Sequence, residues 1–286
     1  MRTRCSGIFV RTCIVAIGLS ALPSLAIAQD SAESSSTERV EKLTVDQVLT
    51  KLEERNAERA AALQGFEGTR IYQMQYRGFP SDRDAEMVVK VKFQAPSSKQ
   101  FTIVSETGSK FVLDHIFKRL LDSEEEALKA DNRQDTALTR QNYTFELQGY
   151  DSSPDGAQYV LKLVPKTKNK FLYRGRIWVD ASDFAVVRIE GEPAKNPSFW
   201  IKRTNIAHSY KKVNDFWLPA ENHTESSIRL GGNATLSIEY RDYRITKSIP
   251  SDTAKSTRDI GRAHRQGIVG AEPAVWESHI AILGSH

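Results

Sequence analysis

Paired carboxylates are the first candidates for chemistry in this chain. Asp180 and Asp183 lie within the stretch FLYRGRIWVDASDFAVVRIEGEP, residues 171–193. Two carboxylates at short spacing can act as general acid and base. An aspartate at a loop corner, however, commonly accepts hydrogen bonds from its own backbone. Because Asp180-Ala181-Ser182-Asp183 separates two apolar runs, we interpret both aspartates as turn residues of a β-hairpin.

Other patterns of catalytic or ligand-binding residues are missing from the sequence. It contains no G-x-S-x-G, H-E-x-x-H, G-x-x-x-x-G-K-[ST] or G-x-G-x-x-G motif. The histidines are scattered along the chain, at His115, His208, His223, His264, His279 and His286. We therefore expect no enzymatic activity, no bound metal and no cofactor.

The strongest local cluster of positive charge lies around the start of this hairpin, at Lys166, Lys168, Lys170, Arg174 and Arg176. In a strand, Arg174 and Arg176 lie on the same face as Trp178. This spacing is compatible with a cation–aromatic ladder or with a contact to lipid headgroups. The alternative, which we favour, is a solvated surface where the arginine stems cover apolar area.

Residues 1–28 have the pattern of a cleavable export signal. Basic residues, an apolar run over residues 12–22 and the small-residue site Ala26-Ile27-Ala28 predict cleavage before Gln29. Cleavage removes both cysteines and three of the 40 basic residues but none of the 36 acidic ones, which leaves a net charge of about +1. This balance gives no reason to expect nucleic-acid binding. No later segment has the roughly 20 apolar residues that a membrane span requires, so we do not expect an integral membrane protein.

Two segments have the apolar spacing of a helix. The first covers residues 44–63, where Thr44 and Gln47 form a capping box and Leu43 with Val48 forms a hydrophobic staple. The second covers residues 110–128 and has a wider apolar stripe. Residues 29–42 are rich in serine and charge and predict a flexible leader, and residues 248–286 are expected to be a largely mobile C-terminal extension.

Period-two alternation predicts about ten strands. Three lie between residues 68 and 108, and seven follow the second helix, at residues 143–150, 158–165, 171–180, 184–190, 199–213, 216–229 and 234–246. The order of helix, three strands, helix and seven strands shows no βαβ alternation. The sequence therefore predicts an α+β, mainly β, antiparallel fold over residues 43–247.

The hairpin poses a packing problem because both of its faces are apolar. Pairing Val179 with Phe184 would place Ile177 opposite Val186 on one face. The other face would then carry Trp178, Ala185, Val187 and Ile189. A half-buried antiparallel pair should instead alternate apolar with polar side chains.

Three features together resemble a known family: an exported chain without mature cysteines, a capped helix that leads into a meander, and the segment RGRIWVDASDFAVVRIEGEPAKNPSFWIKR. This resembles the LolA/LolB-like family of outer-membrane lipoprotein-sorting proteins, most densely over residues 143–245. The resemblance implies a periplasmic protein whose curved antiparallel sheet forms an incomplete barrel closed by two main helices. One face of the hairpin would then line the interior, and the other would need cover from residues 194–200 or from a partner.

On this basis we expect a noncovalent carrier or binder of lipoprotein acyl chains or other lipids. It would exchange its cargo with membrane-anchored donor or acceptor proteins. The alternative is a regulatory or sensor module of the same fold that binds a protein partner. The residues expected to contact the ligand in an apolar cavity are Met87, Val89, Val91, Phe93, Phe101, Ile103, Ile116, Phe117, Phe145, Leu161, Ile177 and Trp178.

Overall fold

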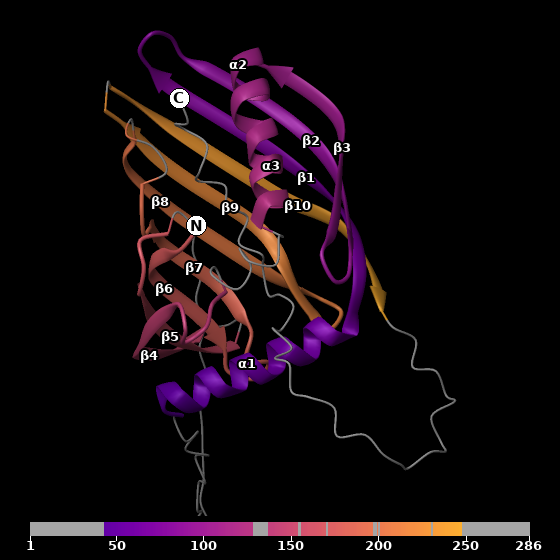
Figure 1. Ribbon diagram of the computed structural model, residues 1–286, viewed down its shortest axis with the longest axis vertical. Helices are drawn as coiled ribbons and strands as arrows, with labels where there is room; N and C mark the ends of the chain where they lie inside the picture. Colours follow the sequence, from indigo (N-terminus) through magenta and orange to yellow (C-terminus); the bar gives the residue numbers. More distant parts are fainter. Residues whose placement is uncertain are drawn as a thin grey trace, which may run out of the picture. The chain divides into compact units, whose positions relative to one another are not determined.

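In the described part of the chain, ten strands form one antiparallel sheet, accompanied by two helical runs (Figure 1). The computed structural model describes residues 43–127, 137–153, 156–169, 171–196, 199, 201–229 and 231–247. All of them belong to the second of the chain's two compact units, Lys42–His286. The predicted signal (1–28), leader (29–42) and C-terminal extension (248–286) lie outside the described residues.

The sheet joins two meanders. The strands are β1 (Leu63–Gly78), β2 (Arg83–Gln94), β3 (Ser98–Gly108), β4 (Tyr143–Ser153), β5 (Gly156–Pro165), β6 (Tyr173–Asp180), β7 (Val186–Pro193), β8 (Ile201–Val213), β9 (Phe216–Ile228) and β10 (Gly232–Lys247). Their spatial order is β3-β2-β1-β10-β9-β8-β7-β6-β5-β4, so pairing of β1 with β10 connects the first three strands to the last seven. The predicted α+β, mainly β, antiparallel architecture is confirmed.

The sheet is open, because β3 and β4 are its two edges. Each edge strand carries a register irregularity, at Val88/Val89 between β2 and β3 and at Leu147/Gly149 between β4 and β5. Bulges are common at the edges of sheets. The sheet does not close into a full barrel, as expected.

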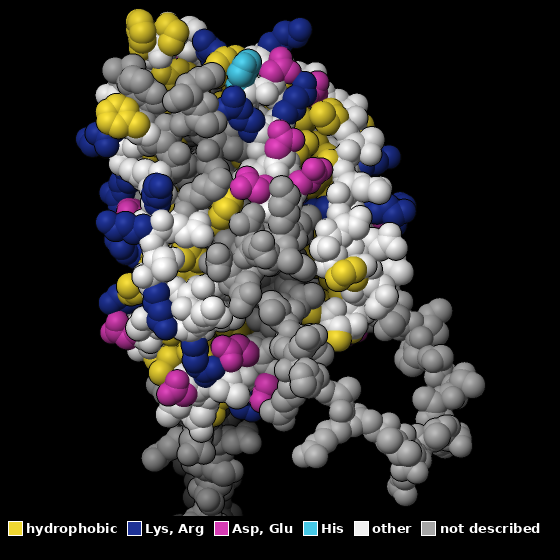
Figure 2. All heavy atoms as spheres, in the orientation of Figure 1, with side chains coloured by type: hydrophobic (Ala, Val, Ile, Leu, Met, Phe, Trp, Pro, Cys, Tyr) yellow, Lys and Arg dark blue, Asp and Glu magenta, His cyan; other side chains and the backbone are white. Residues whose placement is uncertain are grey.

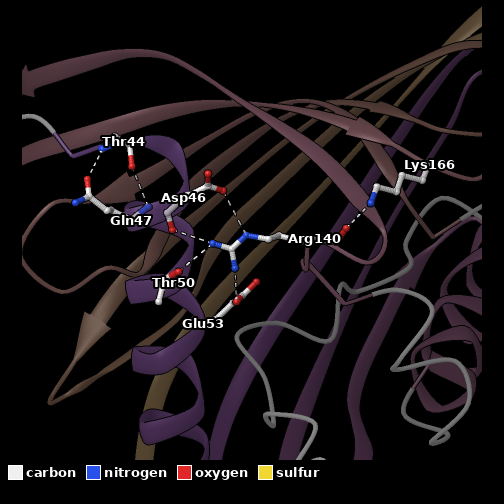
Figure 3. Close-up of polar contacts among 7 residues, drawn as sticks. All are labelled: Thr44, Asp46, Gln47, Thr50, Glu53, Arg140 and Lys166. Atoms are coloured by element: carbon white, nitrogen blue, oxygen red, sulfur yellow. Dashed lines mark hydrogen bonds and ion pairs between the residues drawn. The ribbon is translucent and has the colours of Figure 1, made fainter.

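The first helix, α1 (Val45–Ala62), confirms the predicted element and its cap. The Thr44 hydroxyl accepts from the Gln47 backbone at 3.3 Å, and the Gln47 side chain accepts from the Thr44 backbone at 2.8 Å (Figure 3). This reciprocal pair satisfies two of the free N–H groups at the helix start.

Arg140 ties α1 to the segment before β4 (Figure 3). Its guanidinium donates to Glu53 Oε2 at 2.7 Å, to Thr50 Oγ1 at 3.0 Å and to the Asp46 carbonyl at 2.8 Å. Lys166 in turn donates to the Arg140 carbonyl at 2.6 Å. Arg140 thus links α1 to the chain segments that precede β4 and follow β5.

The second helical run has three parts: α2 (Lys110–Val112), the π-helical segment η1 (Leu113–Phe117) and α3 (Lys118–Ala127). The helix predicted for residues 110–128 is confirmed as far as Ala127, and Leu128 lies outside the described residues. The π-helical turn was not expected from the sequence. Such turns are frequent at functional sites and interrupt the regular hydrogen-bond ladder.

The register predicted for the hairpin is wrong. Asp180 donates its backbone N–H to the Ala185 carbonyl at 2.9 Å, so Val179 pairs with Val186 and not with Phe184. A bulge next to Trp178 then places Ile177 opposite Ile189. The extra residue turns Ile189 to the same face as Ile177, which is why alternation alone assigned it to the wrong face.

Candidate functional site

The candidate site is the inner face of the sheet, defined as the face on which α1 and the η1–α3 run pack. The residues buried there form two separate apolar clusters. The α3 cluster joins η1 and α3 to β1, β2 and β10, and consists of Tyr72, Met74, Ala85, Met87, Val89, Val91, Val112, Leu113, Ile116, Phe117, Leu120, Leu121, Ala234, Leu236, Ile238 and Tyr240. The α1 cluster joins α1 to β4–β8, and consists of Val48, Leu49, Leu52, Tyr143, Tyr159, Leu161, Leu163, Leu172, Tyr173, Ile177, Val179, Val186, Ile189 and Ile206.

The predicted ligand-contacting residues divide between these clusters. The α3 cluster contains Met87, Val89, Val91, Ile116 and Phe117, with Phe101 packed against it. The α1 cluster contains Leu161 and Ile177, with Phe145 packed against it. The structure therefore brings the predicted residues together as two groups, each with its own helix.

Three predicted residues lie outside both clusters. Phe93 is buried and pairs with Phe66 at a ring distance of 5.3 Å. Ile103, on edge strand β3, is 39% exposed. Trp178 belongs to the opposite, outer face, where Arg176 and Arg188 lie 5.2 and 4.8 Å from its ring.

The contacts of Trp178 answer the packing problem of the hairpin. Its inner face, with Ile177, Val179 and Ile189, packs in the α1 cluster. On the outer face the two arginines cover the indole ring, so Trp178 is only 8% exposed. The two arginines thus cover apolar area with their stems and also make cation–aromatic contacts with the Trp178 ring.

Polar residues on β8 and β9 separate the two apolar clusters. We call Thr204, His208, Asn222, Thr224 and Ser226 the polar strip; all five are buried. Thr204 pairs with Ser226, and His208 pairs with Asn222, on the two neighbouring strands. The hydroxyls of Thr204 and Ser226 lie 2.9 Å apart, and Asn222 Nδ2 lies 2.7 Å from His208 Nε2. Buried polar groups are costly unless they are hydrogen-bonded.

A buried ion network holds α3 against the sheet. The Arg70 guanidinium on β1 donates to both carboxylate oxygens of Glu124 on α3, at 2.6 and 3.1 Å, and Lys99 on β3 also bonds to Glu124. The Arg70 guanidinium carbon lies 5.6 Å from the Phe101 ring and 5.2 Å from the Tyr240 ring. The Arg70 and Glu124 side chains are 3% and 1% exposed, so this bidentate pair is almost fully removed from water.

Two tyrosines adjoin this network. Burial raises the pKa of the Tyr243 hydroxyl, and the nearby charge of Arg70 opposes that rise. The hydroxyl donates to the Pro219 carbonyl at 3.0 Å. The Tyr240 hydroxyl is buried and makes no hydrogen bond to the described residues. Within the described part of the interior, the Tyr240 hydroxyl therefore lies beside Arg70 without a hydrogen bond.

The two aspartates of the hairpin serve structural roles, as predicted for the turn. Asp180 Oδ1 accepts hydrogen bonds from the backbones of Ser182 and Asp183, at 2.9 and 2.7 Å. Asp183 Oδ2 contacts Lys212 Nζ at 2.5 Å and accepts from Trp217 Nε1 at 2.9 Å. In the part of the chain that the structure describes, no group of three or more acidic, histidine or cysteine side chains could hold a metal ion.

The environment of Asp183 makes stability depend on pH. Burial by itself would raise the pKa of this carboxyl group, but hydrogen bonds from Lys212 and Trp217 hold the pKa below its ordinary value. A lowered folded-state pKa contributes stability above the unfolded pKa of about 3.9, and this contribution is lost as the pH falls through the folded pKa.

Asp183→Asn is therefore expected to lower the free energy of unfolding at pH 7 and to differ less from wild type as the pH falls below about 4. Urea unfolding at pH 7 and pH 3 measures both differences. Asp122→Asn, at an exposed position of α3, is the control and should behave as wild type at both values. An equal loss at pH 7 and pH 3 would contradict the assigned role of the Asp183 charge.

No helix among the described residues has both the length and the apolar character needed to cross a membrane.

Comparisons with known proteins concern the fold. No family model matches the sequence, and no curated protein matches it. The chain is similar to a solved outer-membrane lipoprotein-sorting protein domain from Vibrio parahaemolyticus, at 11% identity and a TM-score of 0.35 over 71% of this chain and 93% of that one. It is also similar to a LolA superfamily protein from Nitrosomonas europaea, at 13% identity and a TM-score of 0.32 over 73% and 96%.

A third similar structure is MucB in its complex with MucA from Pseudomonas aeruginosa, at 12% identity and a TM-score of 0.24 over 70% of this chain and 99% of that one. These solved structures include proteins of the kind that the sequence resemblance names. Likeness at this level supplies neither a ligand nor a partner.

Sequence reasoning missed both the polar strip and the ion network. Their signals were present: Arg70 stands at an inward position of β1, two residues before Tyr72, and Glu124 opens the acidic run Glu124-Glu125-Glu126. On β9 the residues of both faces are polar between positions 221 and 226. A central strand that is polar on both faces is unusual enough to indicate a special environment.

Proposed function

We propose that this chain is a periplasmic, noncovalent carrier or binder of lipoprotein acyl chains or other lipids, and that it takes part in outer-membrane lipoprotein sorting. One observation carries the proposal: the apolar inner face of β1, β2 and β10 is covered by a separate helical run, η1–α3, whose buried contacts with the sheet include the ion network of Arg70, Lys99 and Glu124. A cover of this kind can be exchanged for another apolar surface more readily than a continuous core can.

An acyl chain would replace the helical side chains against Met87, Val89 and Val91. Each methylene group removed from water contributes about 0.8 kcal/mol, so ten buried methylenes contribute roughly 8 kcal/mol before the costs of ordering the chain. Affinity of this kind needs no polar motif. The polar strip, beside the apolar clusters, would accommodate the uncharged polar atoms at the end of an acyl chain.

We propose no chemical step for this site. The turn aspartates are engaged with the backbone and with Lys212 and Trp217, and binding and release of a lipid require no bond to form or break. Transfer would instead follow differences in affinity between donor, carrier and acceptor.

Lipid extraction from protein purified after export, without detergent, tests the proposal. Mass spectrometry should detect acylated species in near-stoichiometric amounts. A diazirine-labelled palmitate should then crosslink to peptides of β2 and of η1–α3, and excess unlabelled palmitate should abolish the crosslinks. Lipid-free protein whose labelling falls on the outer face, or does not saturate, would overturn the carrier assignment.

A second candidate function is a regulatory module that binds a protein partner. The observation that favours it is the edge strand β3, where Ile103 and Val104 are 39% and 54% exposed beside an unpaired strand edge. An extended segment of a partner can add to such an edge. A photoreactive residue at position 104 should then crosslink to a membrane-anchored protein in cells, and lipid extraction should yield a clean apo-protein.

A further inference from the structure

Two turns meet at one end of the sheet. The β1–β2 turn follows Gly78, and the β9–β10 turn contains Gly231; both belong to the hairpins that flank the β1–β10 pair. The Tyr76 hydroxyl lies 2.5 Å from the Phe79 carbonyl oxygen and 3.3 Å from the Gly231 carbonyl oxygen. A Cβ on Gly78 would lie 2.6 Å from Gly232 Cα, so the turns approach as closely as only glycine permits.

This end of the sheet exposes phenyl rings. Phe79 is 75% exposed and Phe199 is 73% exposed, the largest fractions among the large hydrophobic side chains of the described residues. Phe199 contacts Arg229 of the β9–β10 turn, with the guanidinium 5.1 Å from the ring centre. Phe111, 50% exposed, lies 4.6 Å from the guanidinium of Arg83, at the start of β2.

Positive charge accompanies these rings, while the exposed carboxylates of Asp82 and Asp84 at the same end pair with Arg77. Figure 2 shows hydrophobic and basic side chains gathered at the end where the β1–β2 and β9–β10 turns lie in Figure 1. Lys202 follows Ile201, which pairs with Ile228 at the end of β9. Neither Lys202 nor Arg229 forms an ion pair with a carboxylate of the described residues. We call Phe79, Phe111, Phe199, Arg83, Lys202 and Arg229 the turn surface.

We infer that the turn surface docks the protein on a lipid bilayer that carries anionic headgroups. The rings come from three separate segments, the β1–β2 turn, helix α2 and the chain before β8, and such dispersed rings suit the fluid boundary of a membrane better than the shaped surface of a protein. Aromatic side chains at headgroup depth with lysine and arginine beside them are typical of membrane interfaces. Lys202 and Arg229, which form no ion pair with a carboxylate of the described residues, match the negative potential of an anionic leaflet. Docking does not depend on acyl-chain binding at the inner face.

Cosedimentation with vesicles tests this inference. Protein purified after export is mixed with vesicles of phosphatidylethanolamine and phosphatidylglycerol in a 3:1 ratio, or with phosphatidylcholine alone. Wild type should sediment with the phosphatidylglycerol vesicles. Phe79→Ala with Phe199→Ala should weaken binding at least about tenfold, because each change removes a ring from the membrane interface. Lys202→Gln with Arg229→Gln should weaken binding to the anionic vesicles only, and added salt should remove that difference.

The control is Val164→Ala, an exposed apolar residue away from the turns, and it should change binding less than about twofold. Thermal unfolding that matches wild type shows that each variant is folded. Wild type that fails to bind either vesicle, or a phenylalanine double variant that binds as wild type does, would overturn the inference. Uptake of labelled palmitate, measured in parallel, should be unchanged by the turn-surface variants and so separates docking from carriage.

Discussion

Glu124→Gln is expected to lower the free energy of unfolding by about 3–5 kcal/mol. The substitution keeps the shape of the side chain but removes its charge, and it takes away the carboxylate that both Arg70 and Lys99 contact in the buried network. Glu124 lies on α3, which packs over these cations. Water can therefore reach the cations only when α3 leaves the sheet. Urea unfolding at neutral pH, followed by circular dichroism, measures the loss.

Two further variants give this prediction its controls. Glu125→Gln changes the neighbouring, exposed carboxylate on the same helix and should alter stability by no more than about 0.5 kcal/mol. Replacement of the whole network by Arg70→Met, Lys99→Met and Glu124→Leu should restore most of the loss, since apolar residues of similar volume often replace a buried ion network at little cost. Equal effects at positions 124 and 125 would show that the network does not hold α3.

Much of the fold could be predicted from local patterns. The capping box at Thr44 and Gln47 and the apolar stripes predicted both helical runs, and alternation predicted ten strands with boundaries a few residues away from those observed. These features are local because a helix or an amphipathic strand repeats its pattern every few residues. The pairing of β1 with β10 has no local signal and follows only from the complete sheet.

The interior chemistry could be predicted only in part. Apolar inward residues such as Met87 and Leu161 are correctly placed, because the hydrophobic effect acts on each strand face separately. Arg70 and Glu124 are 54 positions apart in the sequence, and no local pattern around either residue identifies the other as its partner. The polar strip likewise requires β8 and β9 to be in register before His208 and Asn222 meet.

The hairpin shows how one residue changes the assignment of a face. The predicted loop began one position too early, and the bulge near Trp178 added a further shift. A bulge inserts one residue, and no particular type of amino acid marks its position. Alternation therefore cannot locate a bulge. For this reason Ile189 was placed on the outer face, although it packs beside Ile177.

Phe117→Ala is expected to lower the free energy of unfolding by about 3–5 kcal/mol. Phe117 is fully buried at the end of η1, and its ring lies 5.8 Å from the ring of Tyr72 on β1. Its removal leaves a cavity at the junction between the helical run and the sheet. Urea unfolding gives the loss, and hydrogen exchange should show faster exchange in α3 before any change in α1.

Phe111→Ala is the matched control, because it removes the same ring six positions earlier in the same helical run. Phe111 is half exposed and its ring lies beside Arg83 and His115, so we expect a loss below about 1 kcal/mol. Similar losses at both positions would mean that general helix stability, and not contact with the sheet, fixes the run. Faster hydrogen exchange in α3 of the Phe117→Ala variant, without a change in α1, would instead show that this helix can separate from the sheet, as acyl-chain binding requires. Labelled palmitate should then bind faster to this variant than to wild type.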